Sequence, residues 1–311
     1  MSLGCEEIEV YCKEATSFPV RILDIAVLPT ASREKMLSRR ASAFGRRLAR
    51  TFTSASAKPY AVPEGHWGAN RAARLELAAA YRGLDQLGLN EGVCNHLSVV
   101  APRADGAGEA MLVFPFGLHW SEVTASNLVM IDPDAGLVEG DTDPEVTASC
   151  IHLGIRMVRP EAKVIMHTHQ PHVTALACLR DPQLLMMHQN CLRFYNRISH
   201  DRDYGGLAVA LEEGKRLGKV LGSKDVLFMG QHGVLVVAPT VSMAFDHLYY
   251  LERCAELQIL ALATQKEVEL IPEAHCQPMS DVFWRDMQKY ADAHFYSMYR
   301  RLRKTQPDFE L

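Results

Sequence analysis

The sequence lacks the features by which several protein classes are recognised. Its 311 residues contain no uninterrupted run of about 18 apolar residues, so no membrane-spanning helix is expected. A net charge of −4 gives no basic footprint for nucleic acid over the whole chain. None of the eight cysteines forms a CxxC pair, so neither a zinc knuckle nor a thioredoxin motif is predicted. Scattered cysteines in a chain of this length are typical of reduced core residues in an intracellular protein.

What is present is an ordinary globular composition. Apolar residues make up 48% of the chain and charged residues 23%, which excludes disorder as the main state. The length suffices for one large or two small domains with a substantial buried core. Thirteen histidines are the unusual feature, because several of them are close together.

Residues 1–68 differ in composition from the remainder and are predicted to be an N-terminal extension. Its segment 36–57 contains five arginines, many Ser, Thr and Ala, and no acidic residue. That composition matches a mitochondrial transit peptide, although 35 residues precede it. Two explanations remain open: translation begins at Met36 and the protein is mitochondrial, or the segment is a solvated basic tail or surface helix of a cytoplasmic protein.

From residue 69 onward the pattern alternates between helices and strands, which predicts an α/β domain. We expect this domain at 69–265 and a C-terminal helical extension at 266–311. The helix at 143–158 is expected to begin at Asp143-Pro144, since Asp is a good N-cap and Pro suits the first turn. Helices are predicted at 69–88, 121–127, 143–158, 171–179, 211–222, 241–264 and 278–304, and strands at 96–102, 110–116, 128–132, 163–169 and twice within 224–239.

The strongest local signal is His167-Thr168-His169 at the end of a predicted strand. Residues i and i+2 of a strand point to the same face, so both imidazoles can approach one cation. His232, flanked by Gly230 and Gly233, is a candidate third ligand. Three histidines leave a coordination position open, as in catalytic metal sites. Structural histidines are common, so the HxH pair alone does not decide between a metal site and a packed core.

Five segments in a fixed order resemble the class II aldolase and adducin-head family, and together they span about residues 70–265. They are residues 96–102, 114–140, 151–176, 204–222 and 228–258. The resemblance implies a three-layer α/β/α domain with a central, mainly antiparallel sheet, and often a homotetramer with its active site near the subunit interface. It also implies that His167, His169 and His232 bind a divalent metal, most often zinc; a three-His site equally accepts Mn²⁺ or Fe²⁺.

The departures from the family pattern bear on the reaction. Aldolases of the family carry an acid/base carboxylate four residues before the histidine that corresponds to His152, and here that residue is Ala148. The two serines that help to hold substrate phosphate are replaced by Val146-Thr147. The Gly-Asn of the family's phosphate loop reads Asn95-His96. A sugar-phosphate aldolase is therefore disfavoured, while a metal site is retained.

Other residues are candidates to replace the missing acid or to contact substrate. Glu145, His96 and His152 are candidate catalytic groups, although Glu145 also suits the first turn of a helix and His152 also suits the core. The candidate substrate-binding residues are Asn95, Ser98, Gly117 and His119. His119 is equally compatible with an exposed loop.

Two functions from different classes remain. The first is a metal-dependent lyase that acts by aldol cleavage or decarboxylation on a small, oxygenated, unphosphorylated carbon acid. The second is an adducin-like binding or assembly module that has kept the fold without the chemistry. The retained histidines favour the enzyme and the missing acid favours the module. The expected partners are a small-molecule substrate and further copies of the chain, with no nucleic acid.

Overall fold

The computed structural model describes residues 68–134 and 136–311, so the basic segment 36–57 lies outside the described residues. No helix among the described residues has the length and apolarity to cross a membrane. The elements are α3 (Arg71–Gln86), β1 (His96–Pro102), β2 (Glu109–Val113), η2 (Trp120–Glu122), β3 (Val129–Asp132), β4 (Gly136–Glu139), α4 (Val146–Val158), β5 (Val164–Thr168), α5 (Pro171–Ala177), η3 (Gln189–Phe194), β6 (Ile198–Asp201), α6 (Leu211–Leu221), β7 (Val226–Met229), β8 (Gly233–Ala238), α7 (Val241–Ala263), α8 (Glu273–Arg285), α9 (Met287–Thr305) and η4 (Pro307–Glu310).

The strands form one eight-stranded sheet in the order β4-β3-β2-β1-β5-β8-β7-β6. Every neighbouring pair is antiparallel except β6 and β7. The predicted central, mainly antiparallel sheet is therefore confirmed. Strand β5 lies in the middle of the sheet, between β1 and β8. Its last residues therefore lie near the middle of the row of strand ends on that side of the sheet.

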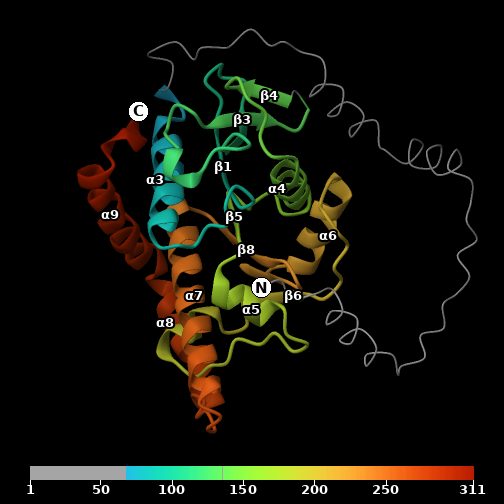
Figure 1. Cartoon of the computed structure of the whole chain (residues 1–311), viewed down its shortest axis with the longest axis vertical. Helices are drawn as coiled ribbons and strands as arrows, with labels where there is room; N and C mark the ends of the chain where they lie inside the picture. The colour runs from blue at the N-terminus through green and yellow to red at the C-terminus, as the bar shows by residue number, and fades with distance from the viewer. Residues whose placement is uncertain (1–67, 135) are drawn as a thin grey trace, which may run out of the picture. The chain divides into compact units, whose positions relative to one another are not determined.

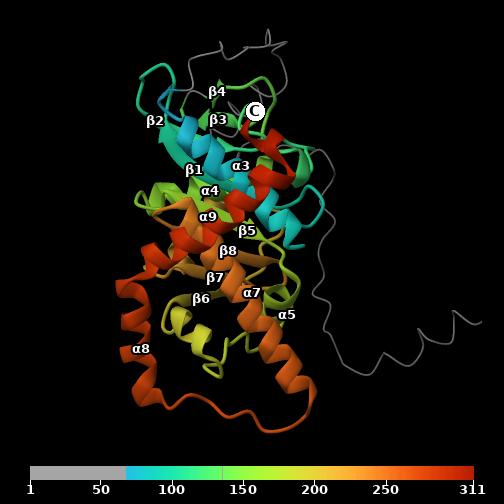
Figure 2. The ribbon, with the colours of Figure 1, turned by 90° about the vertical axis from the view of Figure 1, so that its left-hand side faces the viewer.

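Helices cover both faces of the sheet, which confirms the predicted three-layer α/β/α fold (Figure 1). On one face α4 and α6 pack on alternate residues of β5, β7 and β8, such as Ile165, Leu227 and Leu235. On the other face lie α3, α7 and α9, which contact one another (Figure 2). The sheet is thus buried on both sides, as its continuous Val, Ile and Leu content requires.

Helices α4 and α6 approach one another at paired glycines. A Cβ added to Gly214 would lie 2.1 Å from the carbonyl oxygen of Cys150, and one added to Gly154 would lie 2.7 Å from the Cα of Gly214. No side chain fits at either position. This close contact fixes the position of α4 against α6.

Three predicted elements differ from the structure. Helix α4 begins at Val146 with Glu145 as its N-cap, because Pro144 pairs with Pro115 and the carbonyl of Asp143 accepts the N–H of Phe116 at 3.1 Å. That pairing keeps residues 143–144 extended. The helix predicted at 121–127 is the single turn η2. The helix predicted at 278–304 is two helices, α8 and α9, that meet at Asp286.

The C-terminal segment packs on α3 and α7, two of the helices that cover one face of the sheet. Helix α9 contacts α7 and α3, and Phe309 of η4 is buried. Arg82 of α3 forms an ion pair with Asp308 at 2.8 Å. The domain boundaries at 68/69 and 265/266 stay predictions.

Candidate metal centre

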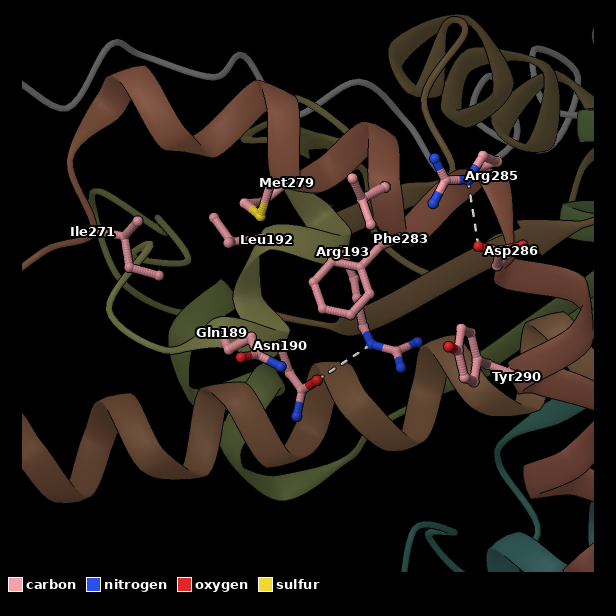
Figure 3. Close-up of a pocket in the computed structure, with 11 residues that line it drawn as sticks. Gln189, Asn190, Leu192, Arg193, Ile271, Met279, Phe283, Arg285, Asp286 and Tyr290 are labelled. Carbon is pink, nitrogen blue, oxygen red and sulfur yellow. Dashed lines mark hydrogen bonds and ion pairs between the residues drawn. The ribbon is translucent and has the colours of Figure 1, made fainter.

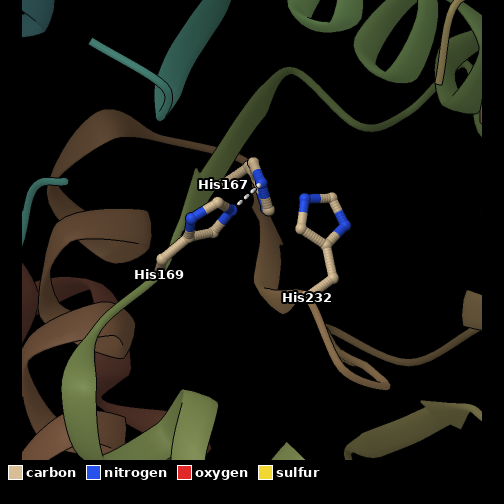
Figure 4. Close-up of side chains that lie close together, drawn as sticks. All are labelled: His167, His169 and His232. Carbon is tan, nitrogen blue, oxygen red and sulfur yellow. Dashed lines mark hydrogen bonds between the residues drawn. The ribbon is translucent and has the colours of Figure 1, made fainter. Parts of the chain in front are cut away.

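The three predicted ligands converge at the edge where β5 ends and the β7–β8 turn begins. His167 is the fourth residue of β5, His169 follows the strand, and His232 lies in the turn that joins β7 to β8. The ring centroids are 4.9 Å apart for His167 and His169, 4.7 Å for His167 and His232, and 5.0 Å for His169 and His232. One ring nitrogen from each residue lies within 4.8 Å of the other two (Figure 4).

Hydrogen bonds orient two of the three rings. His167 Nδ1 lies 3.0 Å from the carbonyl oxygen of Val234, so this nitrogen donates and carries the proton. His169 Nδ1 donates to the carboxylate of Glu91. Both rings therefore present an Nε2 lone pair, and these two nitrogens are only 3.1 Å apart. Two lone pairs at that separation repel unless a proton or a cation lies between them.

Burial keeps the His167 and His232 rings uncharged. Desolvation is the main cause that lowers the pKa of His167 well below its ordinary value, and the neighbouring histidines lower it further. Burial likewise lowers the pKa of His232 to about 4. A neutral imidazole is the form that binds a metal. The donor set, its tautomers and its protonation therefore fit a divalent cation of borderline softness.

The local sequence explains why the turn can carry His232. Gln231 adopts a left-handed φ of 59°, which turns the chain sharply after Gly230. A Cβ on Gly233 would lie 2.6 Å from both His169 Cδ2 and the carbonyl oxygen of Thr168. Only glycine allows β8 to begin this close to the HxH strand.

A cavity of about 390 Å³ opens in front of His169 and His232. Its polar lining includes Glu145, Thr147 and Tyr204, and its apolar lining includes Phe116 and Leu207. Among the described residues that line it, none is Lys or Arg. A substrate bound there would meet the candidate metal ligands, one carboxylate and an apolar wall.

Behind His167 lies a second row of polar side chains, in which His96, Ser98 and His152 are fully buried and Arg156 is partly buried. His96 sits opposite His167 across the β1–β5 pair, with ring centroids 4.9 Å apart. Arg156 donates to Ser98 Oγ at 2.9 Å, Ser98 Oγ lies 2.5 Å from His152 Nδ1, and His152 Nε2 lies 2.9 Å from His96 Nδ1. Ser98 Oγ accepts from Arg156 and can donate its own hydrogen to His152 Nδ1, in which case His152 Nε2 donates to His96.

The row does not open into the cavity. His96 and His152 are 1% and 0% exposed, and burial is the main cause that lowers the pKa of His96 to about 3. The structure therefore places His96 and His152 beside the metal ligands but away from the substrate cavity. Their catalytic roles stay predictions, and the geometry of His96 is that of a positioning residue.

The remaining predicted site residues are divided between the cavity and its surroundings. Glu145 lines the cavity while its carboxylate caps α4 by accepting the Ala148 N–H at 2.8 Å. Asn95 is buried; its Oδ1 accepts the His169 N–H at 3.3 Å, and its Nδ2 has no partner among the described residues. His119 caps η2 through Ser121, and Gly117, with φ 85°, lies one residue beyond Phe116. Neither of the last two lines the cavity.

Sequence reasoning missed Glu91 and Phe116. Glu91 lies 78 residues before its partner His169, so no local spacing identifies the pair. Phe116 occurs within a predicted strand, where its exposure of 60% could not be foreseen. An acidic residue shortly before a motif that contains Asn95 and His96 was the available signal for Glu91.

Comparison with known proteins places the domain. The model of the class II aldolase and adducin N-terminal domain family matches residues 75–259. An adducin-related protein of Schizosaccharomyces pombe is 34% identical over 200 residues, which cover 62% of this chain and 60% of that protein. Alpha-adducin of Rattus norvegicus is 34% identical over 195 residues, which cover 61% of this chain and 26% of that protein. The match thus spans less than two thirds of either relative.

Among solved structures, an aldolase II superfamily protein from Pseudomonas syringae is similar with a TM-score of 0.69 and 27% sequence identity. The similarity covers 78% of this chain and 96% of that chain. The matched region contains all three histidines of the candidate metal centre.

Proposed function

The chain belongs to the class II aldolase and adducin N-terminal domain family, and on that premise we propose that it is a metal-dependent carbon–carbon lyase. The proposed substrate is a small, oxygenated, unphosphorylated carbon acid, and the proposed reaction is aldol cleavage or decarboxylation. Zinc is the proposed metal, with Mn²⁺ or Fe²⁺ as alternatives.

One observation carries this proposal: His167 and His169 turn two Nε2 lone pairs toward one another at 3.1 Å, next to His232. An inert domain gains nothing from this arrangement, since each lone pair would be better satisfied by a hydrogen-bond donor. The Val234 carbonyl and the Glu91 carboxylate fix the tautomers that create it. Such outer partners are a regular feature of histidines that bind metals.

The bound cation would supply Lewis-acid stabilisation of negative charge on a substrate oxygen. The chain's own residues would orient the substrate and handle the proton. Glu145 and Tyr204 line the cavity beside His232 and, together with the Cys94 thiol, are groups there that can exchange a proton. Glu145 also accepts hydrogen bonds from the Thr147 hydroxyl and the Ala148 N–H, which hold its carboxylate at the cavity wall.

The cavity favours a substrate without phosphate. No Lys or Arg lies among its described lining residues, whereas a phosphate dianion calls for cations or several donors. Val93, Phe116, Ile151 and Leu207 give it an apolar wall. A carboxylate with an adjacent hydroxyl or carbonyl oxygen can chelate a metal through two oxygens while an uncharged body rests on this wall.

The alternative function is an adducin-like binding module without activity. Ala148 supports it, because this residue is buried and replaces the family's acid/base carboxylate. The two functions differ in one measurable property, since the enzyme needs a metal and the module does not.

The test is the metal content of the full chain, measured by plasma mass spectrometry, for the wild type and for His167→Ala, His169→Ala and His232→Ala. We expect about one divalent metal per wild-type chain and none in the three variants. His275→Ala is the matched control, because His275 is exposed and far along the chain from the candidate ligands. Absence of metal from the wild type after incubation with Zn²⁺ and Mn²⁺ would contradict the lyase and favour the module.

A positive result leads to a screen of keto acids and hydroxy-aromatic acids for released CO₂ or aldehyde. Release by the wild type and by His275→Ala, but not by the three ligand variants, would identify the reaction. Glu145→Gln should then lower turnover while metal content is unchanged.

We also propose a homotetramer with the cavity near a subunit interface. Phe116, Leu207 and Val209 are exposed apolar side chains at or next to the cavity, and a neighbouring subunit would cover them. Light scattering should give about four times the chain mass, and a monomer would contradict a shared site.

The proposed location is the cytoplasm, or the mitochondrion if translation begins at Met36; imaging of tagged chains that start at Met1 or Met36 distinguishes the two.

A further inference from the structure

A second group of metal-binding side chains lies away from the candidate metal centre. His188 and Cys191 belong to the turn around η3, and Cys254 lies on α7. One ligand atom from each lies within 4.8 Å of the other two. Cys191 and Cys254 are 0% and 1% exposed. The cluster shares no residue and no element with the three-histidine centre.

The turn holds two of the three residues at a chelating distance. His188 and Cys191 are three residues apart, and the Cys191 N–H donates to the His188 carbonyl at 2.9 Å. This closes a tight turn with both side chains near one point. The Cys254 thiol is hydrogen-bonded to the Cys191 sulfur, so the two buried thiols are in direct contact beside the His188 ring.

The position of Cys254 on α7 is part of a regular row. Asp246, Tyr250, Cys254 and Gln258 are spaced four residues apart, so they follow one face of the helix. Arg193 forms an ion pair with Asp246 at 2.8 Å and lies 4.0 Å over the Tyr250 ring. Gln258 accepts the Leu185 N–H at 2.7 Å and donates to the Gln183 carbonyl at 2.8 Å.

The row therefore attaches the irregular segment 183–193 to α7 from both sides of Cys254. Between these attachments lie the two thiols and the His188 ring. The His188 ring has one weak contact, a hydrogen bond of 3.3 Å from the Asn190 N–H to Nδ1. A cation bound at His188 Nδ1 would replace that hydrogen bond.

We propose that His188, Cys191 and Cys254 form a second, structural metal site for a thiophilic d¹⁰ cation, Zn²⁺ or Cu⁺, which clamps segment 183–193 to α7. Two thiolates and one neutral imidazole are a soft donor set that selects such ions. Binding releases the two thiol protons and forms two metal–sulfur bonds, with no change in oxidation state. Zn²⁺ would take a fourth ligand, whereas Cu⁺ is satisfied by three. The neighbouring cavity, of about 670 Å³, is lined by Arg193 of the same segment (Figure 3).

The test uses the full chain carrying His167→Ala, His169→Ala and His232→Ala together, so that any remaining metal is independent of the proposed lyase site. Separate incubations with Zn²⁺, Cu⁺ and Co²⁺ are followed by gel filtration and metal analysis. We expect about one ion per chain, and for Co²⁺ a sulfur-to-cobalt charge-transfer band in the near ultraviolet. An all-imidazole site cannot give that band, so the spectrum identifies the donors. Retention of Zn²⁺ or of Cu⁺ identifies the natural class of ion.

Further substitutions in that background assign the ligands. Cys191→Ser and Cys254→Ser should abolish the band, and His188→Gln should weaken Co²⁺ binding about tenfold or more. Cys178→Ser is the control, because Cys178 is an exposed thiol that should leave the band unchanged. His188→Gln keeps both buried thiols, so it tests the site even if the cysteine variants do not fold. Absence of the band at saturating Co²⁺, or a Cys191–Cys254 disulfide in mass spectra of the purified chain, would overturn the proposal.

Discussion

Histidines at the edge of the cavity and histidines in the interior differ in what their ring nitrogens contact. His167 and His169 each have one nitrogen fixed by an oxygen acceptor and the other facing a second imidazole. His152 has both nitrogens in hydrogen bonds, to Ser98 and His96. In the part of the chain that the structure describes, His247 has no hydrogen bond at either ring nitrogen and contacts the rings of Phe194 and Trp284.

Burial alone therefore does not mark a functional histidine. Burial lowers the pKa of His152, His167 and His247 alike. What separates them is where the ring lone pair points: that of His167 faces other imidazoles, that of His152 is used in a hydrogen bond, and that of His247 lies among aromatic rings. Substitutions at or beside each kind of histidine should therefore have different effects on metal binding and on stability.

Gly233→Ala should disrupt the cavity-edge histidines most strongly. Its Cβ would lie 2.6 Å from His169 Cδ2 and 2.6 Å from the Thr168 carbonyl, and 3.4 Å from His167 Cε1. We expect metal affinity to fall by about 100-fold or more and stability to fall by about 1–3 kcal/mol, since both ligand rings must move. Titration with Zn²⁺ against a chromogenic chelator measures the affinity.

Gly214→Ala is the matched packing defect away from the metal centre. Its Cβ would lie 2.1 Å from the Cys150 carbonyl, so the α4–α6 contact is lost and stability falls by a similar amount or more. The folded fraction should bind Zn²⁺ with wild-type affinity. Equal losses of affinity in both variants would show that Gly233 acts only through general stability.

The interior histidine His247 should make the fold sensitive to acid. Burial lowers its pKa to about 4, whereas the unfolded chain titrates near 6.5, so the unfolded state binds more protons between these values. The free energy of unfolding should therefore fall as the pH drops through that window, by about 2 kcal/mol from this group between about pH 7 and about pH 4.5. Urea unfolding at the two pH values should show a correspondingly smaller loss for His247→Leu. An unchanged pH dependence would mean that His247 does not stay neutral in the fold.

Ser98→Ala should affect stability without affecting the metal. It leaves His152 Nδ1 without its partner in a buried site and removes one of the acceptors of Arg156 Nη2, which costs about 1–3 kcal/mol. Because the row of hydrogen bonds does not enter the cavity, Zn²⁺ affinity should change by less than about threefold. Ser126→Ala, an exposed serine, should change stability by less than about 0.5 kcal/mol. A large loss of Zn²⁺ affinity in Ser98→Ala would instead assign the row a role in the metal centre.

The sequence predicted the part of this site that depends on strand geometry. His167 and His169 share a strand end, and alternation along a strand places both side chains on one face. The partners of these residues were not predictable, because Glu91 and Val234 reach them through the sheet order and not through local spacing. The predicted start of α4 was wrong for a similar reason: pairing of Pro144 with Pro115 overrides the local preference of Asp143 for an N-cap position.

The Cys191–Cys254 contact shows the same limit. The two thiols are 63 residues apart, and only the packing of η3 on α7 brings them together. A single sequence in which no CxxC occurs therefore predicts no thiolate site, even though His188 and Cys191 are spaced three residues apart.

Glu91→Gln should give the smallest and most specific effect. The Glu91 side chain is 64% exposed and accepts the Nδ1–H of His169, so it contributes little to the fold but fixes the tautomer of a candidate ligand. Gln can still accept this hydrogen bond but without the negative charge, so Zn²⁺ affinity should fall about tenfold while the urea midpoint stays constant. Glu109→Gln, an exposed carboxylate paired with Lys163, is the control and should leave the affinity unchanged. If Glu91→Gln and Glu109→Gln bind Zn²⁺ equally well, the His169 ring is held by its packing against His167 and Gly233, and the carboxylate is not part of the metal centre.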